Sequence, residues 1–173
     1  MKLTPVVRRF ILHWGEMGTR WGINRTVAQI HALLYLSPRP LHAEEIAQTL
    51  SVARSNVSNS LRELQGWGIV KMVHLLGDRR DHFESMKDVW EMFRVVIQER
   101  KRREIDPTLA VLRECAAEAG KTEPVDAYTK ERLLQMLQFL ETISGWYEQM
   151  RNLSTGSLIK LAKLGGKVQK LIT

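Results

Sequence analysis

The chain has 173 residues, 44% of them hydrophobic, with a formal net charge of +7 and a pI near 9.8. Its single cysteine, Cys115, excludes an intrachain disulfide, and no apolar run approaches the roughly 18 residues that a membrane span needs. The first residues, MKLTPVVRRF, lack the apolar run of a secretory signal, so we expect a cytoplasmic protein. The basic balance favours a polyanionic partner, although the charge is spread over both halves of the chain.

Two helices are expected before residue 40. Residues 6–17 are mostly apolar, and residues 24–36 repeat apolar side chains at helical spacing. Asn24 can cap the second helix, and the run Ser37-Pro38-Arg39-Pro40 ends it. Leu41 then suits a short strand, and the acids Glu44 and Glu45 suit the first turn of a third helix.

Residues 46–70, IAQTLSVARSNVSNSLRELQGWGIV, contain two short amphipathic patterns separated by a break near Ser51. The apolar positions of both patterns fall at helical spacing: Leu41, Ile46, Ala47 and Leu50, then Val57, Leu61 and Leu64. Two helices of this kind can bury against each other across a tight turn. The stretch therefore predicts a helix-turn-helix.

The second helix, residues 54–66, is expected to turn a polar face outward. About 3.6 residues per turn place Ser55, Asn59 and Arg62 opposite the buried side. Asn56 and Ser58 flank this face, and Arg54 begins the helix. Asn pairs with adenine, Arg with guanine and Ser with either, so we predict that this face reads duplex DNA in the major groove. An ordinary solvent-exposed polar helix is the alternative.

A β-hairpin is expected after this helix pair. Ile69 to Leu75 suit a strand, Gly77-Asp78 suits a tight turn, and His82 to Glu84 suit the returning strand. The tip, residues 77–81, carries Arg79 and Arg80, which can reach phosphate or an adjacent minor groove, with one of the two flanking acids orienting an arginine. An ordinary charged turn is the alternative.

The second half is expected to be helical. A stripe from Val89 to Ile97 runs into the basic cluster 99–103, which either touches the DNA backbone or forms a solvated face. Breaks are expected at Asp106-Pro107 and Glu123-Pro124, with a short helix between them that ends at Gly120. Two further amphipathic helices are expected, with the apolar positions Leu133, Met136, Leu137, Leu140, Ile143, Tyr147 and Met150, then Leu158, Leu161, Leu164, Val168 and Leu171.

These unpartnered apolar stripes lead us to assign the second half to dimerisation across a two-fold axis. The last helix also carries Lys160, Lys163, Lys167 and Lys170, which would suit an acidic membrane surface. Because it lacks bulky aromatic side chains and Gly165-Gly166 is expected to interrupt it, we do not expect membrane binding.

The chain resembles the MarR-like winged-helix transcriptional regulators, most closely their GbsR branch. The resemblance rests on IAQTLSVARSNVSNSLRELQGWGIV, on LGDRRDHFE and on the Asp78-x-Arg80 pattern. It implies a dimeric repressor that binds operator DNA and often responds to a small molecule. By resemblance, the base or phosphate contacts are Arg54, Ser55, Asn56, Ser58, Asn59 and Arg62, and the wing contacts are Arg79 and Arg80.

The expected architecture is mainly α with a small β-hairpin wing. We expect a winged helix-turn-helix over residues 1–86 and a helical dimerisation and effector region over residues 87–173. Two positions depart from the family pattern. Ala53 stands where a Ser or Thr cap is common, which forgoes an acceptor worth about 1 kcal/mol or leaves the helix start open to a phosphate. Ser51 replaces a common turn glycine.

Candidate effector-binding side chains are aromatic. Trp90, Phe93, Trp146 and Tyr147 can line a pocket for a cationic or apolar molecule, or can belong to the core and the dimer interface. The GbsR resemblance suggests a choline-like or osmolyte-related ligand.

We expect neither an enzyme nor a metal site. The chain has no phosphate-binding glycine loop, no HExxH motif and no cysteine cluster, and no cofactor is implied. His74 and His82 can face each other across the hairpin, but no third ligand is near in sequence. The rival function is a winged-helix module that docks proteins, which would need apolar or acidic residues on the face that Ser55, Asn59 and Arg62 occupy.

Overall fold

The computed structural model describes residues 3–119 and 125–172, with side chains described up to residue 164. Contacts divide the chain into two compact units, residues 1–95 and 96–173, and each is described by itself. The expected helix end at Gly120 and the expected turn at Glu123-Pro124 lie outside the described residues. So do the side chains of Lys167, Val168, Lys170 and Leu171.

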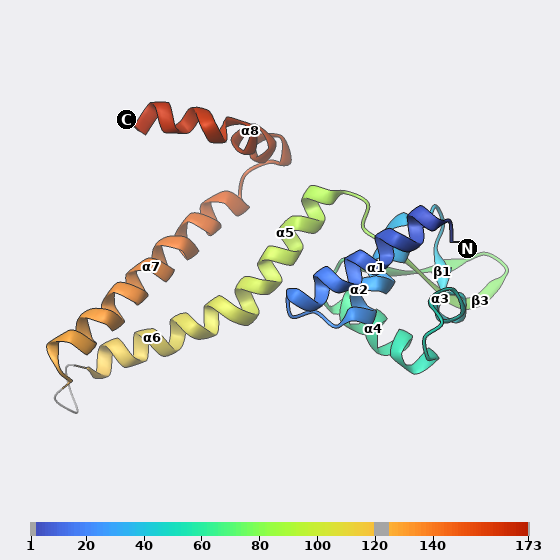
Figure 1. Cartoon of the computed structure of the whole chain (residues 1–173), viewed down its shortest axis with the longest axis horizontal. Coiled ribbons are helices and arrows are strands. Elements are labelled where there is room, and N and C mark those ends of the chain that lie inside the picture. The colour runs from blue at the N-terminus through green and yellow to red at the C-terminus, as the bar shows by residue number, and fades with distance from the viewer. Residues whose placement is uncertain (1–2, 120–124, 173) are drawn as a thin grey trace. The chain divides into compact units, whose positions relative to one another are not determined.

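The first unit begins with the two expected helices, α1 (Pro5–Arg20) and α2 (Arg25–Leu36) (Figure 1). Thr4 caps α1 by accepting from the Val7 amide at 3.3 Å, and Asn24 caps α2 by accepting from the Thr26 amide at 2.8 Å. The helices cross closely because Gly18 has no side chain: a Cβ there would lie 2.6 Å from the Ala28 Cβ. This contact packs α1 directly against α2.

The expected helix-turn-helix is confirmed. The short strand β1 (Leu41–His42) leads into α3 (Ala43–Leu50), and α4 (Arg54–Gly66) follows after a three-residue turn. Ser51 sits in the left-handed region with φ 54°, which is why a glycine would suit this position. The turn is held by a hydrogen bond from the Val52 amide to the Ala47 carbonyl at 3.1 Å.

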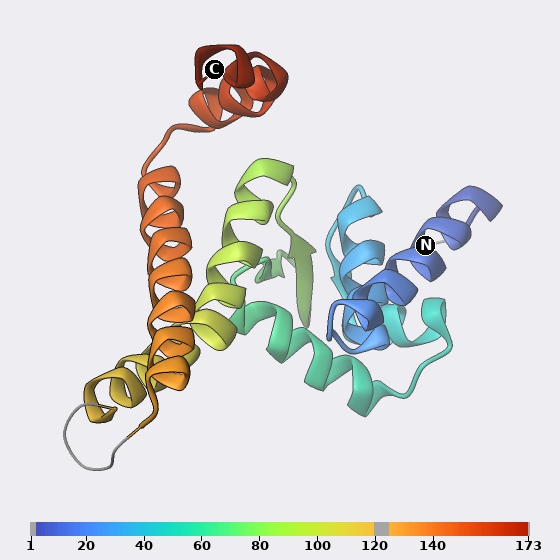
Figure 2. The ribbon, with the colours of Figure 1, turned by 60° about the vertical axis from the view of Figure 1, so that its left-hand side comes forward.

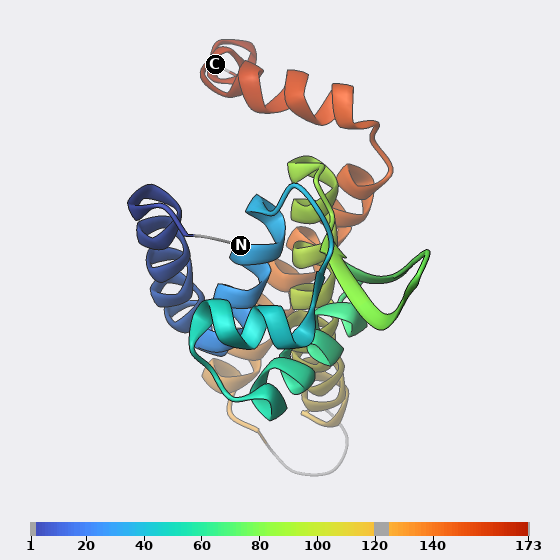
Figure 3. The same ribbon diagram turned by 90° about the vertical axis from the view of Figure 1, so that its right-hand side faces the viewer.

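The wing is an antiparallel hairpin of β2 (Val70–Leu75) and β3 (Asp78–Ser85), joined at Gly77 with φ 81°. It projects from the unit at the right of Figure 3. β1 pairs with the other edge of β3, so the sheet has three strands in the order β1-β3-β2. His82 lies opposite Val73 on one side and opposite His42 on the other, so its histidine neighbour across the sheet is His42 rather than His74.

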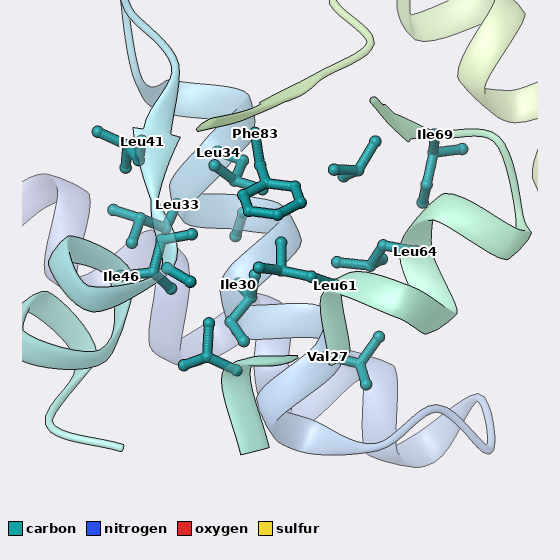
Figure 4. Close-up of a cluster of buried hydrophobic side chains, with 14 of the residues drawn as sticks. Val27, Ile30, Leu33, Leu34, Leu41, Ile46, Leu61, Leu64, Ile69 and Phe83 are labelled. Carbon is teal, nitrogen blue, oxygen red and sulfur yellow. The ribbon is translucent and has the colours of Figure 1, made fainter. Parts of the chain in front are cut away.

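One hydrophobic core joins these elements, and α2 runs through it (Figure 4). Ile30 and Leu33 of α2 are fully buried, and the side chains that α3, α4 and the sheet direct at them are buried as well. Those partners are Leu41, Ile46, Val57, Leu61, Leu64 and Phe83. Burying one such side chain stabilises the fold by about 1.5–3 kcal/mol, so the apolar positions of the helix pair hold its polar face outward.

A lysine ties the start of the next helix to this core. The Lys87 Nζ donates to the carbonyls of Leu34, Tyr35 and Ser37 at 2.8–2.9 Å, at the carboxyl end of α2. Asp88 then caps α5 (Val89–Arg100), accepting from the Trp90 amide at 2.8 Å. The first residues of α5 are therefore fixed to the winged-helix unit.

Helices follow α5 with two differences from expectation. No loop separates α5 from α6 (Asp106–Glu118), because a π-helical turn, η1 (Lys101–Ile105), joins them. Pro107 follows this junction, where the backbone stays helical and the Asp106 amide donates to the Lys101 carbonyl. Gly165-Gly166 does not interrupt α8 (Thr155–Ile172), which runs through both glycines.

In the second unit, α6 packs against α7 (Ala127–Arg151), which Figure 2 shows in orange as one uninterrupted helix. Ion pairs join the two: Arg113 Nη2 lies 2.9 Å from Glu141 Oε1. Lys101 Nζ lies 2.6 Å from Asp106 and 3.4 Å from Glu148. Cys115 on α6 is half-buried.

Candidate nucleic-acid interface

Helix α4 divides into a buried and an exposed side as its spacing predicts. Val57, Leu61 and Leu64 are buried, and Ser60 joins them at 5% exposure. The opposite side is polar and carries the candidate reading residues. Arg54, Ser55, Asn56, Asn59 and Arg62 are exposed, and Ser58 is half-buried.

The two arginines of this face are held only by weak partners. Arg62 Nη1 donates to Asn59 Oδ1 at 3.2 Å, and Arg54 Nη1 donates to Ser58 Oγ at 2.5 Å. Glu44 of α3 lies 4.0 Å from Arg54 Nε, with both side chains more than half exposed. Such contacts contribute little stability, so either guanidinium can leave its partner for a stronger acceptor.

The start of α4 has no side-chain cap. Ala53 adopts the extended backbone of an N-cap but offers no acceptor, in contrast to Thr4 of α1 and Asn24 of α2. Helix N-termini carry free amide hydrogens and a partial positive charge. Because the side chain of Ala53 accepts no hydrogen bond, these amide hydrogens are available to a phosphate. Phosphate binding at the start of α4 stays a prediction.

An acid orients a wing arginine, as expected. Asp78 accepts from the Arg80 Nε at 2.9 Å (Oδ1) and 3.1 Å (Oδ2), and from the Arg80 amide at 3.0 Å. Hydrogen bonds from the Arg80 side chain and backbone hold the pKa of the Asp78 carboxyl well below its usual range. Asp81 instead lies 3.7 Å from His74 Nε2. Arg79 is exposed and has no ion-pair partner among the described residues.

A hollow of about 450 Å³ lies between the start of α3, the side of α4 and strand β3. Among the predicted site residues, Arg54, Ser58, Arg62, Arg79 and Arg80 line it. Ser55, Asn56 and Asn59 lie on the exposed side of α4 and are not part of the lining. Glu44 and Asp81 are the acids in the lining, so arginines outnumber acids and the hollow suits an anionic backbone.

Sequence reasoning missed His42, Gln65 and Phe83, which also line this hollow. His42 enters it because β1 pairs with β3. The ring of His42 lies against that of His82 edge-on, with centroids 5.6 Å apart, and its Nε2 lies 2.9 Å from Arg80 Nη1. Only the pairing of two strands distant in sequence brings these groups together, and no local pattern announces it.

The aromatic candidates for an effector site divide between the units. In the first unit Trp90 is half-buried and Phe93 is exposed. In the second, Trp146 is exposed and Tyr147 is half-buried, with the Lys101 Nζ 5.9 Å from its ring centre. The residues that neighbour Trp90 and Phe93 in sequence, Val89 and Met92, line a separate cavity.

That cavity has a volume of about 240 Å³ and lies within the first unit. Its lining is aromatic and apolar: Phe10, Trp14, His31, Ala32, Tyr35, Val89 and Met92. His31 is only 6% exposed, and its Nε2 is buried with no hydrogen-bond partner among the described residues. Burial, and secondarily the charge of Lys87, lowers the pKa of His31 from 6.5 to about 4, so its imidazole is neutral at pH 7.

Within residues 3–119 and 125–172, no three His, Cys, Asp or Glu side chains gather closely enough to hold a metal ion. In the same ranges, none of the helices combines the length and the apolar character that crossing a membrane requires.

Residues 21–81, from the residue after α1 to the middle of β3, match the model of the MarR family. No curated protein sequence matches the chain significantly. Among solved structures, one described as a transcriptional regulator is similar over 85% of this chain and 96% of its own, with 20% identity and a TM-score of 0.67.

Two other structures align with lower scores. A transcriptional regulator from Thermotoga maritima covers 86% of this chain and 94% of its own, with 18% identity and a TM-score of 0.40. A mutant of MepR from S. aureus covers 80% and 99%, with 18% identity and a TM-score of 0.40. The 0.67 likeness establishes the fold, and the family match covers the helix-turn-helix and most of the wing. Residues 21–81 of the chain are therefore similar to the MarR family of winged-helix transcriptional regulators.

Proposed function

We propose that the chain is a dimeric cytoplasmic repressor that reads a pseudopalindromic operator. In this proposal α4 enters the major groove and residues 77–81 of the wing lie on the backbone or in the minor groove. The observation that carries it is the arginine-lined hollow between α4 and β3, whose rim is the polar face of α4. Placement in the GbsR branch is part of the proposal and rests on the sequence resemblance.

The chemistry of the α4 face favours nucleic acid over a protein partner. Asn59 and Arg62 are exposed, and the outward positions of α4 carry no apolar side chain. A protein-docking helix would bury large apolar anchors at its centre. Short hydrogen-bonding groups with arginine suit base edges and phosphates instead.

Dimerisation is proposed through the second half of the chain, residues 87–173. One side of α7 exposes four large apolar side chains at spacings of three, four and three residues: Met136, Phe139, Ile143 and Trp146. Each is 44–59% exposed, and together they form a continuous stripe, which in a soluble protein marks a partner surface. A second copy of the chain would offer the same stripe across a two-fold axis.

The test is a titration of the full chain against its own upstream DNA at several salt concentrations. We expect two chains per duplex on half-sites about 10 bp apart. The observed affinity should fall steeply with salt, by about 10³-fold or more between 50 and 200 mM if six or more phosphates are contacted. Salt-insensitive binding, or no binding to any duplex, would end the regulator proposal. One chain per duplex would end the dimer proposal.

Modulation by a small molecule is proposed at the aromatic cavity of the first unit. The cavity joins α1 and α2 to the first turn of α5, so a ligand there would contact both the winged helix and the helix that leaves it. Apolar walls with few, well-placed polar groups are typical of ligand sites. The unpartnered His31 Nε2 can bind one hydroxyl group in either tautomer of the ring.

Phenol and benzene probe this cavity as a matched pair. Phenol should raise the unfolding temperature more than benzene at equal concentration, because its hydroxyl satisfies a buried nitrogen, a gain of about 1 kcal/mol. His31→Leu should remove the preference for phenol. Equal stabilisation by both compounds in the wild-type chain would contradict the role of His31. A change in DNA affinity on adding phenol would connect the cavity to regulation.

A further inference from the structure

His42 occupies a junction between two elements of the interface. It is the last residue of β1 and the N-cap of α3, and its half-buried ring faces the hollow beside α4. Its Nδ1 lies 3.2 Å from the Glu45 amide nitrogen of α3, and its Nε2 lies 2.9 Å from the Nη1 of Arg80 on the wing. One imidazole thus connects the first turn of α3 to the wing arginine.

Both contacts present a donor to the ring. A backbone amide and a guanidinium can only donate, whereas a neutral imidazole carries one N–H and a single acceptor nitrogen. A protonated ring would have no acceptor at all. His42 can therefore accept a hydrogen bond from the amide of Glu45 or from the guanidinium of Arg80, but not from both. The donor that is left over faces the N–H of the imidazole ring.

Burial and the neighbouring guanidinium favour the neutral form of the ring. Burial, followed by the charge of Arg80, lowers the pKa of His42, and His82 acts in the same direction. The carboxylates of Glu45 and Asp78 oppose this shift, and each already pairs with an arginine, Glu45 with Arg39 and Asp78 with Arg80. Since a hydrogen bond from a cation is the stronger one, the shorter contact to Arg80 prevails in the free protein.

We propose that His42 is a positioning residue that couples the wing to α3 by changing its tautomer. In the free protein Nε2 accepts from Arg80 and Nδ1 carries the proton, so the wing arginine is held over the hollow while the cap of α3 is lost. When a phosphate draws Arg80 away, Nδ1 releases its proton to water and Nε2 takes one up. Nδ1 then caps α3, and Nε2–H faces the DNA as a donor to a phosphate oxygen.

The inference rests on the proposed function for its DNA-bound state only. In that state each group has a matching partner. Arg80 donates to a phosphate, Nδ1 of His42 accepts from the Glu45 amide, and Nε2–H of His42 donates to a phosphate oxygen. In the free protein two donors, the Glu45 amide and the Arg80 guanidinium, compete for the one acceptor nitrogen of His42, and this competition does not depend on DNA. The two halves can therefore be tested separately.

Nitrogen NMR of the histidine rings in the full chain distinguishes the tautomers directly. We expect wild-type His42 to be protonated at Nδ1 when free and at Nε2 when a cognate duplex is bound. Arg80→Ala should show the Nε2–H tautomer already in the free protein, and Arg79→Ala, the matched control at the neighbouring position, should not. Nε2–H in the free wild-type chain, or no change in Arg80→Ala, would overturn the coupling even if DNA binds.

A second variant separates positioning from capping. His42→Ser keeps a capping oxygen for α3 but has no group that reaches the hollow. We expect it to unfold at a denaturant midpoint close to that of the wild type while binding DNA about 5- to 10-fold more weakly, the effect of one lost hydrogen bond. DNA affinity within twofold of the wild type would overturn the phosphate contact. Absence of DNA binding by the wild-type chain would instead refute the proposed function and leave the free-state result standing.

Discussion

Alanine in place of Arg62 is expected to weaken binding to the cognate duplex by about 10- to 100-fold. The side chain is exposed on the outward side of α4 and is held by the neutral amide of Asn59 alone among the described residues, at 3.2 Å. Moving it to a base therefore costs little. A bidentate arginine–guanine contact is worth about 1–3 kcal/mol of discrimination against the wrong base, which sets the expected loss.

Fluorescence anisotropy with a set of single-base variants of the operator measures this effect. Arg62→Ala should lose discrimination at one base pair of each half-site and keep it elsewhere. Lys130→Ala removes the same charge from an exposed position of α7 and should leave both affinity and discrimination near the wild-type values. If Arg62→Ala binds every duplex as tightly as the wild type does, α4 is not the reading helix.

The free energy of unfolding is expected to fall by about 3 kcal/mol between pH 6.5 and pH 4 on account of His31 alone, at about 1.4 kcal/mol per pKa unit. The pKa of the buried ring is about 4, whereas the unfolded chain restores the ordinary value of 6.5. Between these values the unfolded state binds a proton that the folded state does not. Stability is therefore complete above pH 6.5, declines as the pH falls towards 4, and loses nothing further from this group below it.

Urea denaturation at intervals from pH 7.5 to pH 4 tests this expectation. His31→Leu should flatten the curve in that window, and it should raise stability at the acidic end relative to the wild type. His13→Leu, on the exposed side of α1, serves as the control and should keep the wild-type slope. Parallel curves for the wild type and His31→Leu would show that His31 is not held neutral in the fold.

Local patterns in the sequence predicted most of the winged helix. Apolar spacing located α2, α3 and α4 because each buries one stripe in the same core, and Gly77 located the turn of the wing because its φ of 81° favours glycine. The inward side of α4 was correct to the residue at Val57, Leu61 and Leu64. These features depend on neighbours within a few positions along the chain.

Features built from distant segments could not be predicted in this way. The pairing of β1 with β3 places His42 beside Arg80, and the cavity around His31 needs side chains from α1, α2 and α5 together. The Asp106-Pro107 pair predicts a break because proline ends helices, but the chain stays helical across it through the π-helical turn η1. Gly165-Gly166 predicts an interruption on helix propensity alone, and α8 runs through it because propensity is a weak guide to helix ends.

If the wing contacts DNA as proposed, the carboxylate that holds its arginine also shapes how the protein searches DNA. Because Asp78 neutralises Arg80 within the same hairpin tip, the wing attracts distant phosphates with little more than the charge of Arg79. Weak attraction to phosphates shortens the time that the protein stays bound at each non-operator site. It then slides and hops along the DNA instead of staying bound at the wrong site. In that proposal Arg80 adds its charge only where the local groove or phosphate geometry competes with Asp78, so the hairpin delays its strongest electrostatic contact until the duplex fits.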